Sequence, residues 1–367
     1  MMKQKFSALF LTAAIILTIF SGCSGNNNKP SSPVNNNSSE GTVSSESQTG
    51  TKGSIKIGIS SEFSNLVPLS NNLALSNRDG MTIFALYDTL LWFDTKTFTL
   101  KSWVAKEWTV SDDGLTYTLI LRDDVVFHNG EKLTAEDAAF TLNLLPENPI
   151  ISTQNFPGFE SAEAIDEYTV VIHMSAPFSA MGNALASYHV PLLSKAYYDE
   201  VGWEGYQAHP IGSGPYKFIS YTPGSNLKME ANDSYWNGAP AIKNVEVRIL
   251  PDANAQIISL ETAEIDVLFN PSIQNVTKLD GNDEISWDST DSLLTTLMNY
   301  GSKSPLWTDP NLRKAMASAV NIDAIKENIN LGYTKSATIM LAPGTIGRPD
   351  DEDLPDKFPS DPEAVQK

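Results

Sequence analysis

Few side chains in this sequence could do covalent or metal chemistry. The chain has one cysteine, Cys23, so no disulfide can form within it. The four histidines are His128, His173, His189 and His209, and even the closest two, His173 and His189, are 16 positions apart. No pair therefore has the His-x-x-x-His spacing of a zinc site. We predict no metal site, and we expect each histidine to lie at the surface or to cap a backbone group.

Hydrolysis and nucleotide binding also lack their usual sequence patterns. The segment IGSGPY at residues 211–216 does not have the Gly-x-Ser-x-Gly spacing of a nucleophile elbow. Neither the Walker glycine pattern nor the dinucleotide-binding one occurs. We therefore expect no catalytic residue, no cofactor and no enzymatic activity. A peptidase is the remaining enzyme class to consider, and it would release hydrolysed product from peptides.

The residues before Cys23 have the pattern of an export signal. Lys3 and Lys5 supply a positive start, residues 6–20 form an apolar run, and Ser21 and Gly22 put small side chains before the cysteine. Small residues leading into a cysteine resemble the lipobox of bacterial lipoproteins, in which the thiol is acylated. The lipobox usually has leucine three places before the cysteine, whereas this chain has Phe20 there.

The sequence thus predicts a signal peptide at residues 1–22 and a lipid attachment site at Cys23. Two acyl chains hold a protein stably on a membrane where one chain is marginal. Residues 23–53 are rich in Asn and Ser with almost no core-forming residue, so we expect a disordered tether. We expect the protein on the outer face of the cytoplasmic membrane, at the surface of a Gram-positive cell, or on the periplasmic side in a Gram-negative cell.

The net charge argues against anionic partners. The chain carries 25 Lys and Arg against 44 Asp and Glu, a formal charge of −19. Nucleic acid and anionic lipid both require clustered positive charge, so we expect no nucleic-acid partner.

Local patterns predict the first elements of the folded body. SIKIGIS at residues 54–60 alternates like a strand, and residues 80–94 have helical spacing that runs into a strand. Asp113-Gly114 and Asn129-Gly130 predict tight turns. Thr134, followed three positions later by Asp137, predicts the start of a helix.

These elements, in this order, resemble the signature region of the family 5 extracellular solute-binding proteins, the peptide- and nickel-binding components of ABC importers. The resemblance includes the tryptophan before SDDG, the Leu121-Arg122 pair and the LTAEDA helix start. Most of these residues should be structural. Residues 164–174 alternate like an edge strand, HPIGSGPYKF at 209–218 resembles the family's Gly-Thr-Gly-Pro-Tyr segment, and PNLRKAMASAVNIDAI at 310–325 looks like a helix.

The resemblance implies an α/β fold of the type II periplasmic-binding-protein kind, with two lobes joined by a hinge. Lobe I should comprise residues 54–77 and 209–284, with residues 78–208 as an inserted subdomain. Residues 285–367 should begin lobe II. Family members usually continue for well over a hundred residues, so we expect lobe II to be incomplete in this chain.

The function that the resemblance implies is capture of oligopeptides or dipeptides by a monomeric, lipid-anchored receptor, which delivers them to an ABC permease. A receptor for nickel chelates or another small solute is an alternative, and so is a truncated fragment that serves as a surface interaction module. By position in the family pattern, eight residues should contact ligand between the lobes: Phe63, Asn65, Asn71, Asn72, Phe156, Phe159, Phe269 and Asn270.

Overall fold

The computed structural model describes residues 52–69, 77–279, 281–290, 292, 294–301, 303–342, 345 and 347–349. The predicted signal peptide, Cys23, most of the tether, Asn71 and Asn72 lie outside these residues, so what we expect of them stays a prediction. No helix in the described part is long and apolar enough to span a membrane.

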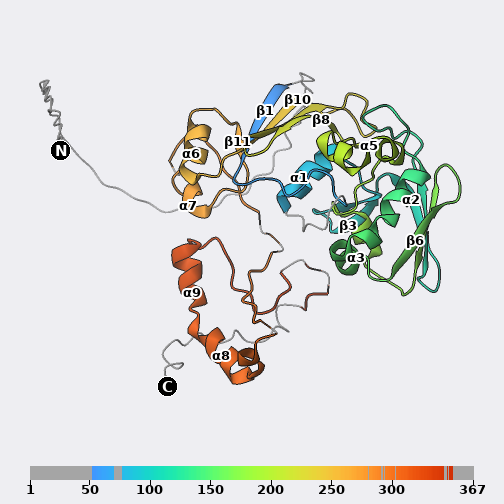
Figure 1. Cartoon of the computed structure of the whole chain (residues 1–367). Helices are drawn as coiled ribbons and strands as arrows, with labels where there is room; N and C mark the ends of the chain where they lie inside the picture. The colour runs from blue at the N-terminus through green and yellow to red at the C-terminus, as the bar shows by residue number, and fades with distance from the viewer. Residues whose placement is uncertain are drawn as a thin grey trace, which may run out of the picture. The chain divides into compact units, whose positions relative to one another are not determined.

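The first sheet has five strands in the order β11-β1-β10-β9-β8. The predicted strand at residues 54–60 is confirmed as β1, which pairs in parallel with β10 and β11, while β10-β9 and β9-β8 are antiparallel. β1 and β10 can be followed side by side in Figure 1. The bounds of these strands are β1 Lys52–Ile59, β8 Tyr216–Thr222, β9 Asn226–Ala231, β10 Ile242–Ile249 and β11 Val267–Leu268.

Helix α6 (Ala253–Glu261) connects β10 to β11. Its N-cap is Asp252, whose carboxylate accepts the backbone N–H groups of Asn254 and Ala255 at 3.0 and 2.8 Å. Because β10, β1 and β11 run parallel, their carboxyl ends meet at one edge of the sheet. The chain segments that follow these three strands therefore start at the same edge.

A second group of strands forms a hairpin and a four-stranded antiparallel sheet of order β4-β5-β7-β6. Residues 164–174 are not an edge strand, contrary to the sequence prediction, because β7 lies between β5 and β6. Val170, Ile172 and Met174 are buried while their neighbours are partly exposed, so a central strand covered on one face alternates just as an edge strand would. The bounds are β2 Leu91–Asp94 and β3 Thr99–Ser102 for the hairpin, and β4 Ala105–Val110, β5 Thr116–Leu121, β6 Phe159–Ala164 and β7 Thr169–Met174 for the sheet.

Both predicted tight turns are confirmed. Gly114 has a φ of 71° and donates its N–H to the Ser111 carbonyl at 2.9 Å, between β4 and β5. Gly130 has a φ of 90° and donates to the Phe127 carbonyl at 2.9 Å. Both positions need the left-handed backbone conformation that glycine adopts without strain.

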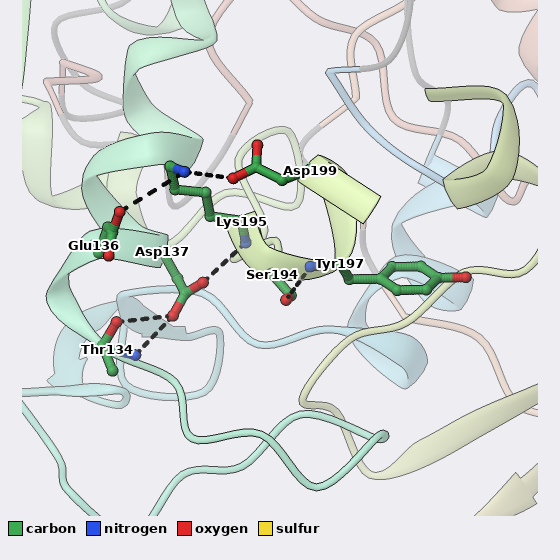
Figure 2. Close-up of polar contacts among 7 residues, drawn as sticks. All are labelled: Thr134, Glu136, Asp137, Ser194, Lys195, Tyr197 and Asp199. Atoms are coloured by element: carbon green, nitrogen blue, oxygen red, sulfur yellow. Dashed lines mark hydrogen bonds and ion pairs between the residues drawn. The ribbon is translucent and has the colours of Figure 1, made fainter. Parts of the chain in front are cut away.

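The helices that pack near these sheets include the two predicted from sequence, at α1 and α2. Their bounds are α1 Asn77–Leu86, α2 Ala135–Asn143, α3 Pro149–Asn155, α4 Met181–Leu185 and α5 Lys195–Ala208, with a 3-10 turn at Leu145–Glu147. Asp137 ties α2 to α5, as Figure 2 shows. Its carboxylate accepts the backbone N–H and hydroxyl of Thr134 at 2.9 and 3.0 Å and the backbone N–H of Lys195 at 2.9 Å. The LTAEDA motif therefore has a structural role here, because it fixes two helix starts against each other.

A buried carboxylate joins segments that are distant in sequence. Asp88 is 2% exposed and accepts four hydrogen bonds, from Trp103 Nε1 at 2.8 Å, Ser213 Oγ at 2.9 Å, Tyr235 Oη at 2.9 Å and Trp236 Nε1 at 3.1 Å. Burial raises the pKa of the Asp88 carboxyl, and these four bonds partly offset that rise. The Gly-Ser-Gly segment is thereby held against the end of α1.

His128 holds the same glycine segment from another side. Its Nδ1 accepts the Gly212 N–H at 3.2 Å, and its Nε2 donates to the Gly214 carbonyl at 3.1 Å. A Cβ on Gly212 would lie 2.0 Å from the Leu86 carbonyl oxygen, so close backbone approach requires glycine there. His128 thus satisfies backbone groups as expected, and its burial lowers the pKa of the ring to about 4.

Beyond β11 the described chain contains short helices. The predicted helix in residues 310–325 is confirmed for its first part as α8. The elements are α7 Ile273–Val276, a 3-10 turn at Pro305–Thr308, α8 Pro310–Ala319, α9 Ile322–Ala324 and a π-helical turn at Ile325–Ile329.

Candidate functional site

The loop that follows β1 forms one wall of the candidate site. It starts at the carboxyl edge of the five-stranded sheet, which is where ligands bind in open α/β sheets. Glu62 fixes the start of the loop, because its carboxylate accepts the Tyr221 hydroxyl and the backbone N–H of Gly224. Phe63, 6% exposed, lies edge-on to the Tyr221 ring at 6.0 Å between centroids.

Asp79 holds the middle of this loop against the first turn of α1. Its carboxylate is fully buried and accepts the Ser64 N–H at 2.8 Å. An acidic side chain in the first turn also interacts favourably with the helix dipole. The loop and the start of α1 are therefore one rigid corner of the sheet edge.

Asn65 closes a small turn within the loop. Its side-chain amide donates to the Val67 carbonyl at 2.7 Å and accepts the Val67 N–H at 3.0 Å. Further along the loop, the Asn148 side chain donates to the Leu69 carbonyl at 3.0 Å. These bonds order a segment that has no regular secondary structure.

Tyr188 and His189 lie beside the same corner. A Cβ on Gly80 would be 3.0 Å from the Tyr188 ring, so the ring packs directly on the first turn of α1. Burial raises the pKa of the Tyr188 hydroxyl, and the negative charge of Asp79 raises it further. The Tyr188 and His189 rings stack at 4.4 Å.

The segment after β11 reaches the same edge. Phe269 donates its backbone N–H to the Gly58 carbonyl at 2.9 Å, and its side chain is 40% exposed. Asn270 follows with a φ of 50°, in the left-handed region that asparagine tolerates better than most residues. An exposed aromatic ring and an amide are thus fixed next to the end of β1.

The structure brings four of the predicted ligand residues to this edge: Phe63, Asn65, Phe269 and Asn270. Phe156 is 1% exposed and belongs to the core, and Phe159 opens β6 and packs against that core. Their contact with ligand, like that of the other predicted residues, stays a prediction.

Sequence reasoning missed several residues that shape the site, namely Glu62, Asp79, Tyr188, His189 and Tyr221. A sequence pattern could have indicated Asp79. An acidic residue predicts the start of a helix, and a helix that follows a parallel strand starts near the carboxyl edge of the sheet. Glu62 lies next to Phe63 in the loop that the family pattern indicated, whereas Tyr188, His189 and Tyr221 come from segments distant in sequence, so no spacing rule reveals them.

The arrangement can bind polar groups. Glu62 and Asp79 make the corner anionic, and both already accept backbone N–H groups of the chain. Among the described residues, no group of three or more His, Cys, Asp or Glu side chains is arranged to hold a metal ion. The chemistry that this geometry supports is hydrogen bonding and stacking against a small solute.

Comparison with known proteins gives matches along most of the chain. The sequence model for bacterial extracellular solute-binding proteins, family 5 (middle), matches residues 99–367. The glutathione-binding protein GsiB of Pectobacterium atrosepticum is 30% identical over 287 residues, 77% of this chain and 54% of GsiB. GsiB of Escherichia coli strain K12 is 28% identical over 293 residues, 79% of this chain and 56% of that protein. The chain thus spans about half the length of the curated relatives it matches.

Solved structures share the fold. The periplasmic binding protein DppA of Helicobacter pylori, in complex with peptide STSA, has a TM-score of 0.77 at 22% identity, over 87% of this chain and 66% of DppA. The oligopeptide-binding protein AppA of Bacillus subtilis, in complex with a nonapeptide, has a TM-score of 0.69 at 24% identity, over 86% and 62% of the two chains. A nickel ABC transporter protein of Bacillus halodurans has a TM-score of 0.63 at 27% identity, over 80% and 58%.

Proposed function

Because the chain belongs to the bacterial extracellular solute-binding proteins of family 5, we propose that it captures oligopeptides or dipeptides outside the cell and delivers them to an ABC permease. The observation that carries the proposal is the corner at the carboxyl edge of β1 and β11, on a fold shared with peptide-bound DppA and AppA. The protein acts by binding alone, so no bond in the peptide is broken.

Capture uses two lobes that close on the peptide. Lobe I comprises residues 54–77 and 209–284, residues 78–208 form its inserted subdomain, and lobe II begins at residue 285. The strand pairing supports this division, because the five-stranded sheet draws on residues 52–59 and 216–268 and the four-stranded sheet on residues 105–174. A peptide favours the closed state only to the extent that it binds that state more tightly than the open one.

The protein works as a monomer attached to the membrane through acylated Cys23, after cleavage of residues 1–22. The sequence pattern before Cys23 and the family's extracellular role support this attachment. The tether of residues 23–53 leaves the binding body free to turn between solute and permease.

A nickel chelate is the second candidate solute. The 27% identity to the nickel ABC transporter protein of Bacillus halodurans favours it. Since no described cluster of side chains suits a bare metal ion, the chelating molecule would supply the nickel ligands.

Isothermal titration of this chain against STSA, Met-Leu, glutathione and the nickel–histidine complex tests the proposal. We expect heat of binding from at least one of the three peptides. Heat from the nickel complex alone would establish the second candidate instead. No heat from any of them, with a folded chain by circular dichroism, would contradict both.

A matched pair of variants locates the site. Asp79→Asn weakens the hold on the loop at Ser64 and should weaken peptide binding. Asp166→Asn is the control, because Asp166 also accepts backbone N–H groups, among them that of Tyr168 at 2.9 Å, in a turn of the four-stranded sheet. Equal peptide affinities of the two variants would argue against the site at the Asp79 corner, which the loop after β1 and the start of α1 form.

A further inference from the structure

Ser187, Tyr188 and His189 form a short polar segment between α4 and α5. Tyr188 and His189 are partly buried, with stacked rings 24° apart in plane. Tyr188 also lies edge-on to Phe84 of α1, at 6.0 Å between ring centroids. The Tyr188 ring thus packs on α1, next to the Asp79 corner described above, and the His189 ring stacks on Tyr188.

Ser187 favours one tautomer of His189. Its Oγ lies 2.7 Å from His189 Nδ1 and also accepts the backbone N–H of His189 at 3.3 Å. If Nδ1 carried the proton, the Ser187 hydroxyl proton would have no partner among the described residues. The network is complete when Ser187 donates to Nδ1, which leaves the ring proton on Nε2. Burial lowers the pKa of His189, so the neutral ring prevails at pH 7.

Two hydrogen-bond donors are therefore left without a partner in the described part of the chain. They are the Tyr188 hydroxyl and His189 Nε2–H. Neither atom is among the fully buried polar atoms that lack a partner, which are Thr82 Oγ1, Tyr87 Oη and Ser336 Oγ. Both donor atoms are consequently not fully buried.

We propose that Tyr188 and His189 together donate hydrogen bonds to a backbone carbonyl oxygen of the captured peptide, an inference that rests on the proposed function. Two adjacent donors suit an acceptor oxygen. The buried Asp79 carboxylate makes the potential at Tyr188 negative, which favours a neutral carbonyl oxygen over a carboxylate. The pair thus selects for peptide backbone and sets its position relative to α1.

The test measures STSA binding by titration calorimetry in four variants of the chain. Tyr188→Phe and His189→Phe keep the stacked rings and each remove one donor, so each should weaken binding by about 3- to 10-fold. His189→Gln keeps an N–H donor near the position of Nε2 and should recover most of the loss. His173→Phe is the matched control, since His173 pairs with Glu163 on the four-stranded sheet, and its affinity should equal that of the parent.

The C-terminal amide of STSA separates the two kinds of acceptor oxygen. If the acceptor is a backbone carbonyl, each Phe variant should lose affinity by the same factor for the acid and for the amide. A loss confined to the acid would overturn the carbonyl assignment in favour of a carboxylate.

Failure of this inference differs from failure of the proposed function. If the parent binds STSA and both Phe variants bind it equally well, the inference is wrong and the function stands. If the parent binds no peptide, both are wrong. If a variant folds poorly, nitrogen NMR of the parent chain is measured instead. The inference requires that His189 Nε2 is protonated and that its NMR signal shifts when STSA is added. An unchanged Nε2 signal would overturn the inference.

Discussion

Residues 52–279 and residues 281–349 differ in how they bury apolar side chains. In the first region, strands and helices share one core cluster whose buried residues run from Ile59 to Ile249. In the described residues of the second region no strand occurs, and Leu294 and Met340 are 72% and 70% exposed. The first region therefore has the packing of a cooperative folding unit, whereas the described residues of the second draw little stability from burial.

The same difference bears on function. The Asp79 corner, the end of β11 and the Tyr188-His189 pair all belong to the first region, where packing holds them in place. A preformed half-site binds with a smaller entropic cost than one that must be ordered by its ligand. The first region should accordingly supply the fixed wall of the site.

The largest expected contrast comes from the same substitution in the two regions. Leu119 is 0% exposed, so Leu119→Ala should lower the free energy of unfolding by about 2–5 kcal/mol. Leu294→Ala, at a 72% exposed position, should change it by less than about 0.5 kcal/mol. Urea unfolding followed by circular dichroism measures both. A large loss from Leu294→Ala would mean that the second region has a core of its own.

Acid should act on the first region, since all four histidines lie there. His128 has a pKa of about 4 in the folded chain against 6.5 for an ordinary histidine, so between these values the unfolded chain binds more protons. The contribution of His128 to the free energy of unfolding is complete above pH 6.5. As the pH falls towards 4, up to about 3 kcal/mol of this contribution is lost.

Unfolding of the parent and of His128→Gln, measured from pH 7 to pH 4, isolates this effect. Asp88 and Asp137 have raised pKa values and oppose it, but they are common to both proteins and cancel in the difference. The stability difference should shrink as the pH falls. A difference that does not depend on pH would refute the role given to His128.

The smallest expected contrast comes from helix caps. Asp252→Ala removes the N-cap of α6 and should cost about 1 kcal/mol of unfolding free energy. Asp309 caps α8 in the second region by accepting the Asn311 N–H at 2.8 Å. Asp309→Ala should leave the main urea transition unchanged. Equal losses from the two variants would place α8 in the same cooperative unit as the sheet.

Local features of the fold could be predicted from the sequence. The turns at Gly114 and Gly130, the helix start at Thr134 and the alternation of β1 depend on neighbouring residues alone. The central position of β7 could not be predicted, because a sheet covered on one face gives its inner and edge strands the same alternation. The bonds from Asp88 to Trp103, Ser213, Tyr235 and Trp236 likewise depend on tertiary packing.

The candidate site shows the same limit. The family resemblance indicated the loops after β1 and β11, and the structure places Phe63 and Phe269 at one sheet edge. It did not indicate Asp79 or the Tyr188-His189 pair, because their proximity arises only when the segment between α4 and α5 packs on α1. Sequence spacing cannot report a contact between residues more than a hundred positions apart.

Hydrogen exchange of this chain with and without STSA, read by mass spectrometry, tests directly whether the segments after β1 and β11 bind the peptide. We predict slower exchange in residues 60–69 and around Phe269 and Asn270 when the peptide is present, with little change in the turns of the four-stranded sheet. Protection confined to those turns, or none at all under conditions where calorimetry detects binding, would contradict this prediction.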